Sequence, residues 1–260
     1  MSAAASSSAL LRVDKVTRRF GGLTAVKNVS FTVEPGQLFG LIGPNGAGKT
    51  TMFNLITGLY VPSEGTISLG DAPLSGLPPH RITAGGIART FQNIRLFGGL
   101  SVLDNVKIAC HLRHGATLIA SVMGSKALRG SEAAIDATAN RLLAIMGLDR
   151  LAHETAANLS YGHQRRLEIA RALATEPRLL LLDEPAAGMN PQESLDLMHL
   201  IRRLRDEFRL TILLVEHNMK VVMGVCERIH VMDHGESIAE GSPEQIRRDA
   251  KVIEAYLGAG

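Results

Sequence analysis

One short stretch constrains the fold of this chain more than any other: Gly43-Pro44-Asn45-Gly46-Ala47-Gly48-Lys49-Thr50, which has the form G-x-x-x-x-G-K-[ST]. An apolar run, Leu38 to Ile42, precedes it, and apolar residues at helical spacing follow it, so we expect a buried strand, a loop and a helix. The backbone N–H groups of such a loop and the helix dipole can bind phosphate. Lys49 can reach the terminal phosphates of a nucleotide, and the Thr50 hydroxyl can ligate Mg²⁺.

The composition indicates a large hydrophobic core and no membrane span. The chain has 260 residues, 45% of them hydrophobic, and its net charge of +3 is spread along the sequence rather than gathered into a nucleic-acid groove. Cys110 and Cys226 lack the spacing of a zinc or disulfide framework, which suits a reducing compartment. The longest apolar candidate, Ala116 to Gly124, is about half as long as the roughly 20 residues that a membrane helix requires.

The N-terminus, residues 1–9, is rich in Ser and Ala and lacks the basic start and long apolar segment of a signal peptide. We expect it to be a disordered tail. The sequence therefore predicts a soluble, cytoplasmic protein that reaches a membrane only by docking to something there.

Three near-continuous apolar runs, at 38–42, 179–182 and 211–215, alternate with helical patterns. This arrangement is typical of a parallel sheet covered on both faces by crossover helices. Shorter alternating segments at 11–20 and 28–33 come first, and they predict antiparallel strands ahead of the phosphate-binding strand. The fold class expected is therefore α/β.

Between these parts the pattern becomes helical. Ser101-Val102-Leu103-Asp104 has the form of a capping box that opens a helix, whereas the segment 116–130 is poorly periodic and could be helix or loop. We predict a helical subdomain over 93–165, inserted into a nucleotide-binding core formed by 10–92 and 166–260. A later capping sequence, Ser242-Pro243-Glu244-Gln245, predicts one last helix.

Polar residues follow the predicted core strands. Asp183-Glu184 ends one strand, Glu216-His217 ends another, and Gln92 ends a shorter strand that begins at Ile87. Because ligands of parallel sheets bind at the carboxyl ends of the strands, we expect these residues to meet the phosphate-binding loop. Asp183 suits the Mg²⁺ shell, and Glu184 can act as general base toward the attacking water. Taken alone, Gln92 and His217 would be ordinary strand-end residues.

A second candidate anion site opens the helix that begins near residue 160, at Leu159-Ser160-Tyr161-Gly162-His163. With small residues at Ser160 and Gly162, its N-terminus can present backbone N–H groups to an anion. The loop at 43–50 already binds the chain's own phosphates. A further anion site on a separate helical subdomain makes sense if it completes the site of another copy.

The order of these motifs resembles that of the ATP-binding subunit of an ABC transporter, and the resemblance runs from Leu11 to Leu257. Within that family the chain is most similar to the ATPases of branched-chain amino-acid uptake systems, the LivG type. The stretches that carry this closer resemblance are 88–97, 161–171, 183–191, 240–243 and 254–258.

The resemblance implies a P-loop NTPase (RecA-like) core with an N-terminal antiparallel β subdomain and an inserted α-helical subdomain. It implies an ATPase with ATP and Mg²⁺ as cofactors, in a head-to-tail dimer with a second copy or a sister ATPase. The other partners implied are a pair of integral membrane permease subunits and a periplasmic solute-binding protein, with no nucleic acid. The ATPase would lie peripherally on the cytoplasmic face of the inner membrane and power uptake of branched-chain amino acids or related small polar solutes.

The resemblance also implies roles for individual residues. It makes Glu184, His217, Gln92 and Lys49 catalytic, with His217 on the γ-phosphate. It gives Thr50, Gln92 and Asp183 to Mg²⁺. Phe20 takes the adenine-stacking position, where an aromatic residue could also simply belong to the core. The full set of nucleotide contacts is Phe20, Gly43, Asn45, Gly46, Ala47, Gly48, Lys49, Thr50 and Thr51 from one subunit, with Ser160 and Gly162 from the other.

Some alternatives stay open at this point. His163 stands where the family has Gln, and its weaker bond back to the Ser160 cap would fit a non-catalytic half of a dimer. Intact Glu184 and His217 favour hydrolysis. An ABC-type ATPase acting on a ribosome or a DNA-repair target is the other alternative, but such proteins typically carry paired P-loops or a long coiled coil, and this chain has one P-loop and no heptad stretch.

Overall fold

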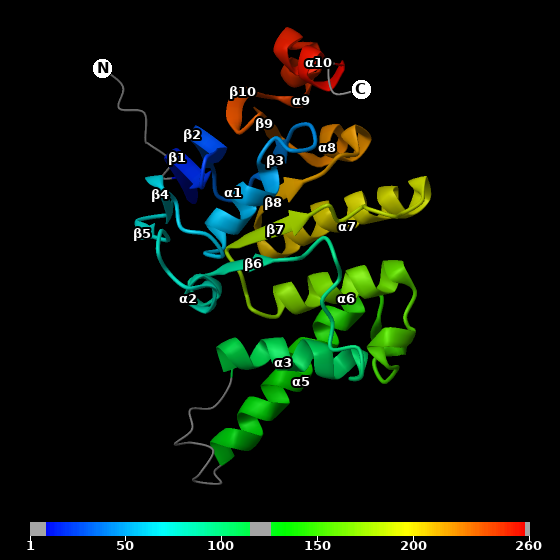
Figure 1. Ribbon diagram of the computed structural model, residues 1–260. Coiled ribbons are helices and arrows are strands. Elements are labelled where there is room, and N and C mark those ends of the chain that lie inside the picture. Colours follow the sequence, from blue (N-terminus) through cyan, green and yellow to red (C-terminus); the bar gives the residue numbers. More distant parts are fainter. Residues whose placement is uncertain (1–8, 115–125, 258–260) are drawn as a thin grey trace, which may run out of the picture. The chain divides into compact units, whose positions relative to one another are not determined.

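The computed structural model describes residues 9–114 and 126–257, which form two compact units (Figure 1). The first unit comprises the chain up to Ile87 together with Leu179 onward, and the second runs from Ala88 to Arg178. Apart from Ala9, which is buried, the predicted disordered tail lies outside the described residues. So does most of the segment 116–130, whose last residues belong to a helix.

The larger sheet has the strand order β10-β9-β3-β8-β7-β6. At its centre, β3 (Leu38–Ile42), β8 (Thr211–Val215) and β7 (Leu179–Asp183) are parallel and buried along their whole length, as their continuous apolar sequences predict. On the other side of β3, β9 (Arg228–Asp233) is also parallel, and β10 (Glu236–Gly241) pairs with it antiparallel. The second unit begins within β6 (Ile87–Arg89).

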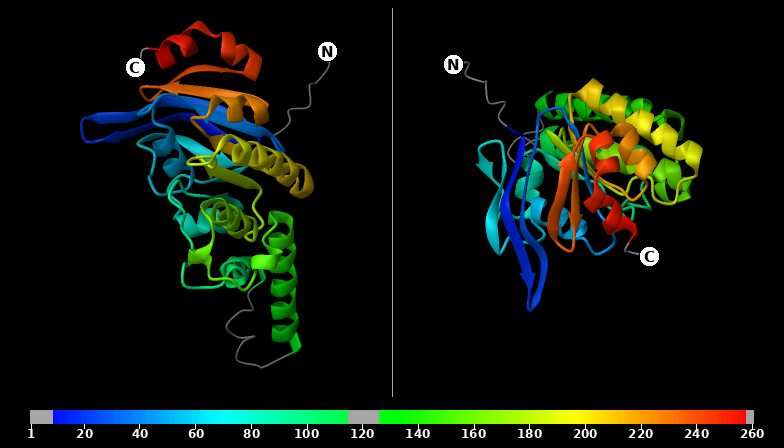
Figure 2. Two further views of the ribbon diagram at one scale, coloured as in Figure 1. Left: turned by 90° about the vertical axis from the view of Figure 1, so that its right-hand side faces the viewer. Right: turned by 90° about the horizontal axis from the view of Figure 1, so that it is seen from above.

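The smaller sheet is antiparallel, in the order β2-β1-β4-β5. Its strands are β1 (Leu11–Phe20), β2 (Leu23–Val33), β4 (Glu64–Leu69) and β5 (Ala72–Pro73). The first two form the long blue hairpin of Figure 2, which turns at Gly21-Gly22. The N-terminal antiparallel β subdomain is thus present as predicted.

Helix α1 (Lys49–Ile56) is central to the first unit, because its apolar side chains fill the core that both sheets share. Met52, Phe53 and Ile56 have no exposed surface, and they cluster with residues of β1, β3, β7 and β8. The remaining helices of this unit are α2 (Pro79–Ala84), α7 (Pro191–Phe208), α8 (Met219–Val225), α9 (Pro243–Arg248) and α10 (Ala250–Leu257).

The C-terminal segment differs from the single last helix that the sequence predicted. A capping box at Ser242 and Gln245 opens α9 as expected, but the helix stops before Asp249. Asp249 has an extended backbone, and its carboxylate accepts the backbone N–H groups of Lys251 and Val252 at 2.9 and 3.2 Å, which opens α10 as a separate helix.

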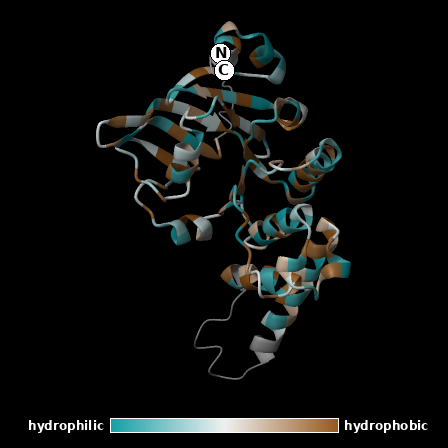
Figure 3. Ribbon diagram, turned by 45° about the vertical axis from the view of Figure 1, so that its right-hand side comes forward, coloured by the Kyte–Doolittle hydropathy of each residue, from teal (hydrophilic) through white to brown (hydrophobic). Residues whose placement is uncertain are grey.

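The second unit is built from α3 (Val102–His114), α5 (Lys126–Met146) and α6 (Tyr161–Leu173), which pack against one another. Short 3₁₀ turns, η1 (Asp149–Leu151) and η2 (Ala156–Asn158), join α5 to α6. Ser101 caps α3 as predicted, since its hydroxyl accepts the Asp104 N–H at 3.0 Å, but the Asp104 carboxylate accepts from that hydroxyl instead of from the backbone N–H that would complete a capping box. Figure 3 shows apolar and polar residues mixed along these helices, as amphipathic packing requires.

The boundary of this unit differs from the predicted insert, 93–165. All of α6 belongs to the unit, because its buried residues Leu167, Ala170 and Leu173 lie on a helix that packs against α3 and α5. No described helix is both long enough and apolar enough to cross a membrane.

Gly65 and Gly36 offer a matched test of the packing around β1. Their φ angles are similar, +80° and +75°, but a Cβ at Gly65 would lie 2.3 Å from the Lys15 carbonyl oxygen, whereas one at Gly36 would meet nothing within 4 Å. Gly36→Ala should cost only backbone strain, about 1 kcal/mol of unfolding free energy. Gly65→Ala should cost about 1–3 kcal/mol more, because backbone must move. Urea denaturation measures both losses, and equal losses would contradict the tight contact.

Candidate functional site

The phosphate-binding loop joins β3 to α1 and packs closely against the backbone of neighbouring segments. A Cβ at Gly43 would lie 2.0 Å from the Met232 carbonyl oxygen, and one at Gly48 would lie 2.6 Å from that of Ala25. On the turn between β9 and β10, Gly235 donates its N–H to the Ala47 carbonyl at 3.2 Å. Glycine is therefore required at 43 and 48 by close backbone packing, before any ligand is considered.

Lys49 ties the two ends of this loop together. The side chain is buried, and its ammonium donates to the carbonyl oxygens of Gly43 at 2.7 Å and Pro44 at 2.8 Å. Burial lowers the pKa of Lys49, while the negative charges of Glu184 and Asp183 act to raise it. The loop lysine and both carboxylates that follow β7 therefore share one electrostatic environment.

Glu184 and His217 meet across the ends of two neighbouring strands. Asp183 at the end of β7 pairs with Val215 at the end of β8, so the residues that follow these strands start side by side. Glu184 adopts a left-handed backbone conformation, φ +46°, which is uncommon for a residue with a side chain. Its Oε1 lies 2.6 Å from His217 Nε2, within hydrogen-bond distance. The first unit therefore brings Lys49, Asp183, Glu184 and His217 together, as the sequence predicted.

Phe20 ends β1, with 37% of its surface exposed. The Tyr60 ring meets it edge-on at a centroid distance of 5.0 Å, and the Arg18 guanidinium lies 4.5 Å from its centroid. The ring is thus supported by neighbours while staying partly open to solvent. A partly open aromatic ring of this kind can stack on a base.

Ser160 caps α6, and its hydroxyl accepts the His163 N–H at 3.4 Å. Ser160 is exposed, and a Cβ at Gly162 would meet nothing within 4 Å, so the space in front of this first turn is open. The turn is stabilised by Gln164, whose side chain donates to the Leu159 carbonyl at 3.1 Å. Open N–H groups at a helix N-terminus favour an anion.

Gln92 lies in a loop of the second unit, not at the end of a strand as predicted, because β6 already ends at Arg89. The backbone after β6 is instead held by α6. Arg165 donates to the carbonyl oxygens of Phe91 at 2.6 Å and Gln92 at 3.0 Å. Glu168, paired with Arg165 at 2.7 Å, accepts the Phe91 N–H at 3.1 Å. This buried pair fixes the Gln92 backbone on the helix that Ser160 caps, while the Gln92 side chain is exposed.

Residue spacing alone marks neither Arg165 nor Glu216 as part of the site. Arginine is mostly exposed in proteins, so nothing in a helical pattern marks Arg165 as fully buried. In the sequence, Glu216 stands out only as the neighbour of His217. A charged residue directly after a wholly apolar strand is a signal that could have found it.

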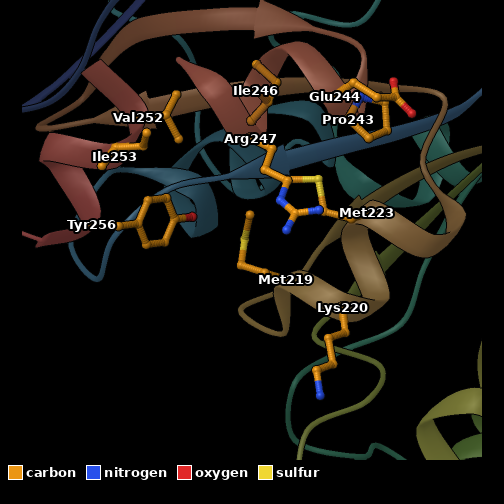
Figure 4. Close-up of a pocket in the computed structure, with 10 residues that line it drawn as sticks. All are labelled: Met219, Lys220, Met223, Pro243, Glu244, Ile246, Arg247, Val252, Ile253 and Tyr256. Atoms are coloured by element: carbon orange, nitrogen blue, oxygen red, sulfur yellow. The ribbon is translucent and has the colours of Figure 1, made fainter. Parts of the chain in front are cut away.

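A further hollow of about 600 Å³ lies among α8, α9 and α10 (Figure 4). Met219 and Met223 of α8 face Ile246 of α9 and Val252 and Tyr256 of α10. Its lining is mainly apolar, which distinguishes it from the charged strand ends where Lys49, Glu184 and His217 lie.

The described residues contain no group of three or more His, Cys, Asp or Glu side chains that could hold a metal ion by itself. Two oxygen donors of the kind Mg²⁺ prefers are nevertheless present, the carboxylate of Asp183 at the end of β7 and the hydroxyl of the exposed Thr50 in the first turn of α1. Such a pair fits a Mg²⁺ ion that arrives with its other ligands supplied by phosphate and water.

The fold and these strand ends define a P-loop nucleotide-binding domain. A family model described as "ABC transporter" matches residues 26–187, and one described as "Branched-chain amino acid ATP-binding cassette transporter" matches residues 236–260. The chain belongs to the ATP-binding cassette (ABC) transporter family. The predicted family, the α/β P-loop NTPase fold and the ATPase class are thereby confirmed.

Individual relatives agree with this assignment. The Escherichia coli K12 protein named high-affinity branched-chain amino acid transport ATP-binding protein LivG is 48% identical over 253 residues, which cover 97% of this chain and 99% of LivG. The ADP conformation of MJ1267, an ATP-binding cassette of an ABC transporter, aligns with a TM-score of 0.83 and 31% identity over 96% of this chain and 99% of its own. The ATP-binding cassette MJ0796, a dimer bound to ADP and Pi, aligns with a TM-score of 0.75 and 28% identity over 90% and 98%.

The buried pair between Arg165 and Glu168 predicts a large loss of stability when it is broken. Its side chains are 0% and 5% exposed, whereas the surface pair between Arg19 and Glu64, at 2.6 Å, is 49% and 57% exposed. Arg165→Met should cost about 3–5 kcal/mol, because a buried carboxylate loses its partner. Arg19→Met, the matched control, should cost about 0–1 kcal/mol. Denaturant unfolding followed by circular dichroism compares the two variants. Similar losses of unfolding free energy would show that the buried pair contributes little.

Proposed function

We propose that this chain powers the uptake of branched-chain amino acids or related small polar solutes, as the ATP-binding and hydrolysing subunit of an ABC importer. The observation that carries the proposal is the 48% identity to LivG over almost the full length of both proteins. The separate match of residues 236–260 to a branched-chain amino acid transporter model agrees with it. No observation favours the alternative of a ribosomal or DNA-repair target.

ATP binding is proposed to use the loop between β3 and α1. Its backbone N–H groups and the N-terminus of α1 face the phosphates, and Lys49 exchanges the carbonyl oxygens of Gly43 and Pro44 for phosphate oxygens. The exposed tip at Asn45 and Gly46 leaves that side of the loop open to ligand. Phe20 stacks on the base. The other contacts proposed are Ala47, Gly48, Thr50 and Thr51.

Hydrolysis is proposed to use Glu184 as general base and His217 as a hydrogen-bond partner of the terminal phosphate. Their contact of 2.6 Å supports this, because both side chains already face one point at the strand ends. Asp183, Thr50 and Gln92 are assigned to bound Mg²⁺, which would supply charge neutralisation for the phosphates. Lys49 adds a fixed positive charge.

A second subunit is proposed to complete the site with Ser160 and Gly162. The open turn of α6 supports this, as does the dimeric state of the structural relative MJ0796. The partner is a second copy or a sister ATPase. The assembly also includes a pair of membrane permease subunits and a periplasmic solute-binding protein, with this subunit on the cytoplasmic face of the inner membrane.

Glu184→Gln tests the proposed chemistry. The amide keeps the size of the side chain but is not a base, so kcat should fall about 10²–10⁴-fold. Equilibrium binding of Mg-ATP should be nearly unchanged, because Lys49 and the loop are intact. Phosphate release and nucleotide binding are measured on the same preparation. Normal turnover by this variant would refute the assigned base.

Lys49→Met tests the phosphate site with a matched surface control. Losing a buried, charge-assisted donor should weaken Mg-ATP binding by roughly 10–100-fold, the equivalent of about 1.5–3 kcal/mol. Lys27→Met removes a lysine that pairs with Glu236 at 2.7 Å and whose side chain is 64% exposed, and it should leave binding unchanged. Calorimetric titration gives both dissociation constants. Equal affinities of the two variants for Mg-ATP would show that the phosphates do not bind beside Lys49.

A further inference from the structure

Glu216 is a buried carboxylate between two loops that carry the proposed chemistry. Only 3% of its surface is exposed, although it directly follows β8 at the edge where the site lies. One carboxylate oxygen accepts the Ala186 N–H at 2.7 Å, from the loop that follows Glu184. The other accepts the N–H groups of His217 at 3.1 Å and Asn218 at 3.3 Å, from its own loop.

The hydrogen bonds of Glu216 lie just beyond the ends of the paired strands β7 and β8. The parallel pairing of β7 with β8 stops at Asp183 and Val215, and the Glu184 N–H donates once more to the Val215 carbonyl at 2.8 Å. Beyond that point the chain turns away through the left-handed Glu184. The Glu216 side chain then continues the connection between the loops, in place of further backbone pairing.

A carboxylate is the group that this arrangement requires. It offers two acceptor oxygens and no donor, so it can satisfy N–H groups on both loops at once. The amide of Gln has the same shape but only one acceptor oxygen, and its NH₂ group would face the N–H groups of one loop. Burial and the nearby charge of Glu184 raise the pKa of Glu216, while the three backbone N–H groups act to lower it.

We propose that Glu216 is a positioning residue for ATP hydrolysis: by bridging the loop after Glu184 and the loop that carries His217, it sets the contact between those two side chains. The inference rests on the proposed roles of Glu184 and His217. It predicts that Glu216 affects the chemical step rather than nucleotide binding, since none of its bonds reaches the phosphate-binding loop.

The first experiment compares Glu216→Gln with wild type in Mg-ATP binding and in steady-state hydrolysis. We expect kcat to fall about 10–100-fold, as for other displaced catalytic geometry, with the dissociation constant for Mg-ATP changed less than about threefold. The matched control is Glu240→Gln, which alters a half-buried carboxylate whose hydrogen-bond partners, Arg228 and His230 of β9, have no role in the proposed site. It should leave kcat unchanged. Thermal melts confirm that each variant is folded at the assay temperature.

The second experiment is a double-mutant cycle of Glu216→Gln with His217→Ala, which separates positioning from a general loss of stability. If Glu216 acts through His217, the double variant should hydrolyse ATP within about threefold of His217→Ala alone, because the arrangement is already lost. If the fold reductions in kcat caused by the two single substitutions multiply in the double variant, the inference is overturned. A normal kcat in Glu216→Gln would overturn it too.

The single variants Glu184→Gln and His217→Ala distinguish a failure of the proposed function from a failure of the role proposed for Glu216. If both are slow but Glu216→Gln is normal, only the role of Glu216 is wrong. If Glu184→Gln hydrolyses normally, the proposed function fails and the inference fails with it.

Discussion

Backbone packing behind the phosphate-binding loop is the constraint on which the rest of the site depends. Gly43 sits so close to the Met232 carbonyl that no side chain fits, and Gly235 bonds the loop from the same turn. The loop conformation is therefore set by segments near residues 25, 232 and 235, which meet the loop only when the first unit is folded. A phosphate site formed in this way is organised before ligand arrives, so binding does not have to order the loop.

Charge is the second constraint at these strand ends. The charges of Asp183 and Glu184 act on the single loop ammonium of Lys49, and Glu184 and Glu216 bring two further like charges near each other. The Glu216 carboxylate accepts hydrogen bonds from three backbone N–H groups, and the Glu184 carboxylate contacts His217. The surplus of negative charge around Lys49 fits a role for Mg²⁺ as counter-ion to both protein and nucleotide.

Much of this was predictable from the sequence, because the signals were local. The continuous apolar runs of β3, β7 and β8 and the caps at Ser101 and Ser242 each depend on a few neighbouring residues. Two predicted elements had the wrong bounds, one because of contacts distant in the sequence and one because of a local side chain. Arg165 and Glu168 bind the backbone around Gln92 and so end β6 early, and the Asp249 side chain divides the C-terminal helix. The burial of Arg165 and Glu216 depends on contacts across the fold, which residue spacing does not encode.

We propose that the ATP site at the loop of one subunit is completed by the start of α6 in another. The most direct measurement is disulfide cross-linking of Glu184→Gln protein, with Asn45→Cys on one tagged copy and Ser160→Cys on another, because both positions are exposed while Cys110 and Cys226 are buried. A cross-link between differently tagged chains should form with Mg-ATP and should not form without nucleotide. If Ser160→Cys cross-links to no loop cysteine in a second copy or in a sister ATPase while ATP is bound, α6 does not complete the site of another subunit.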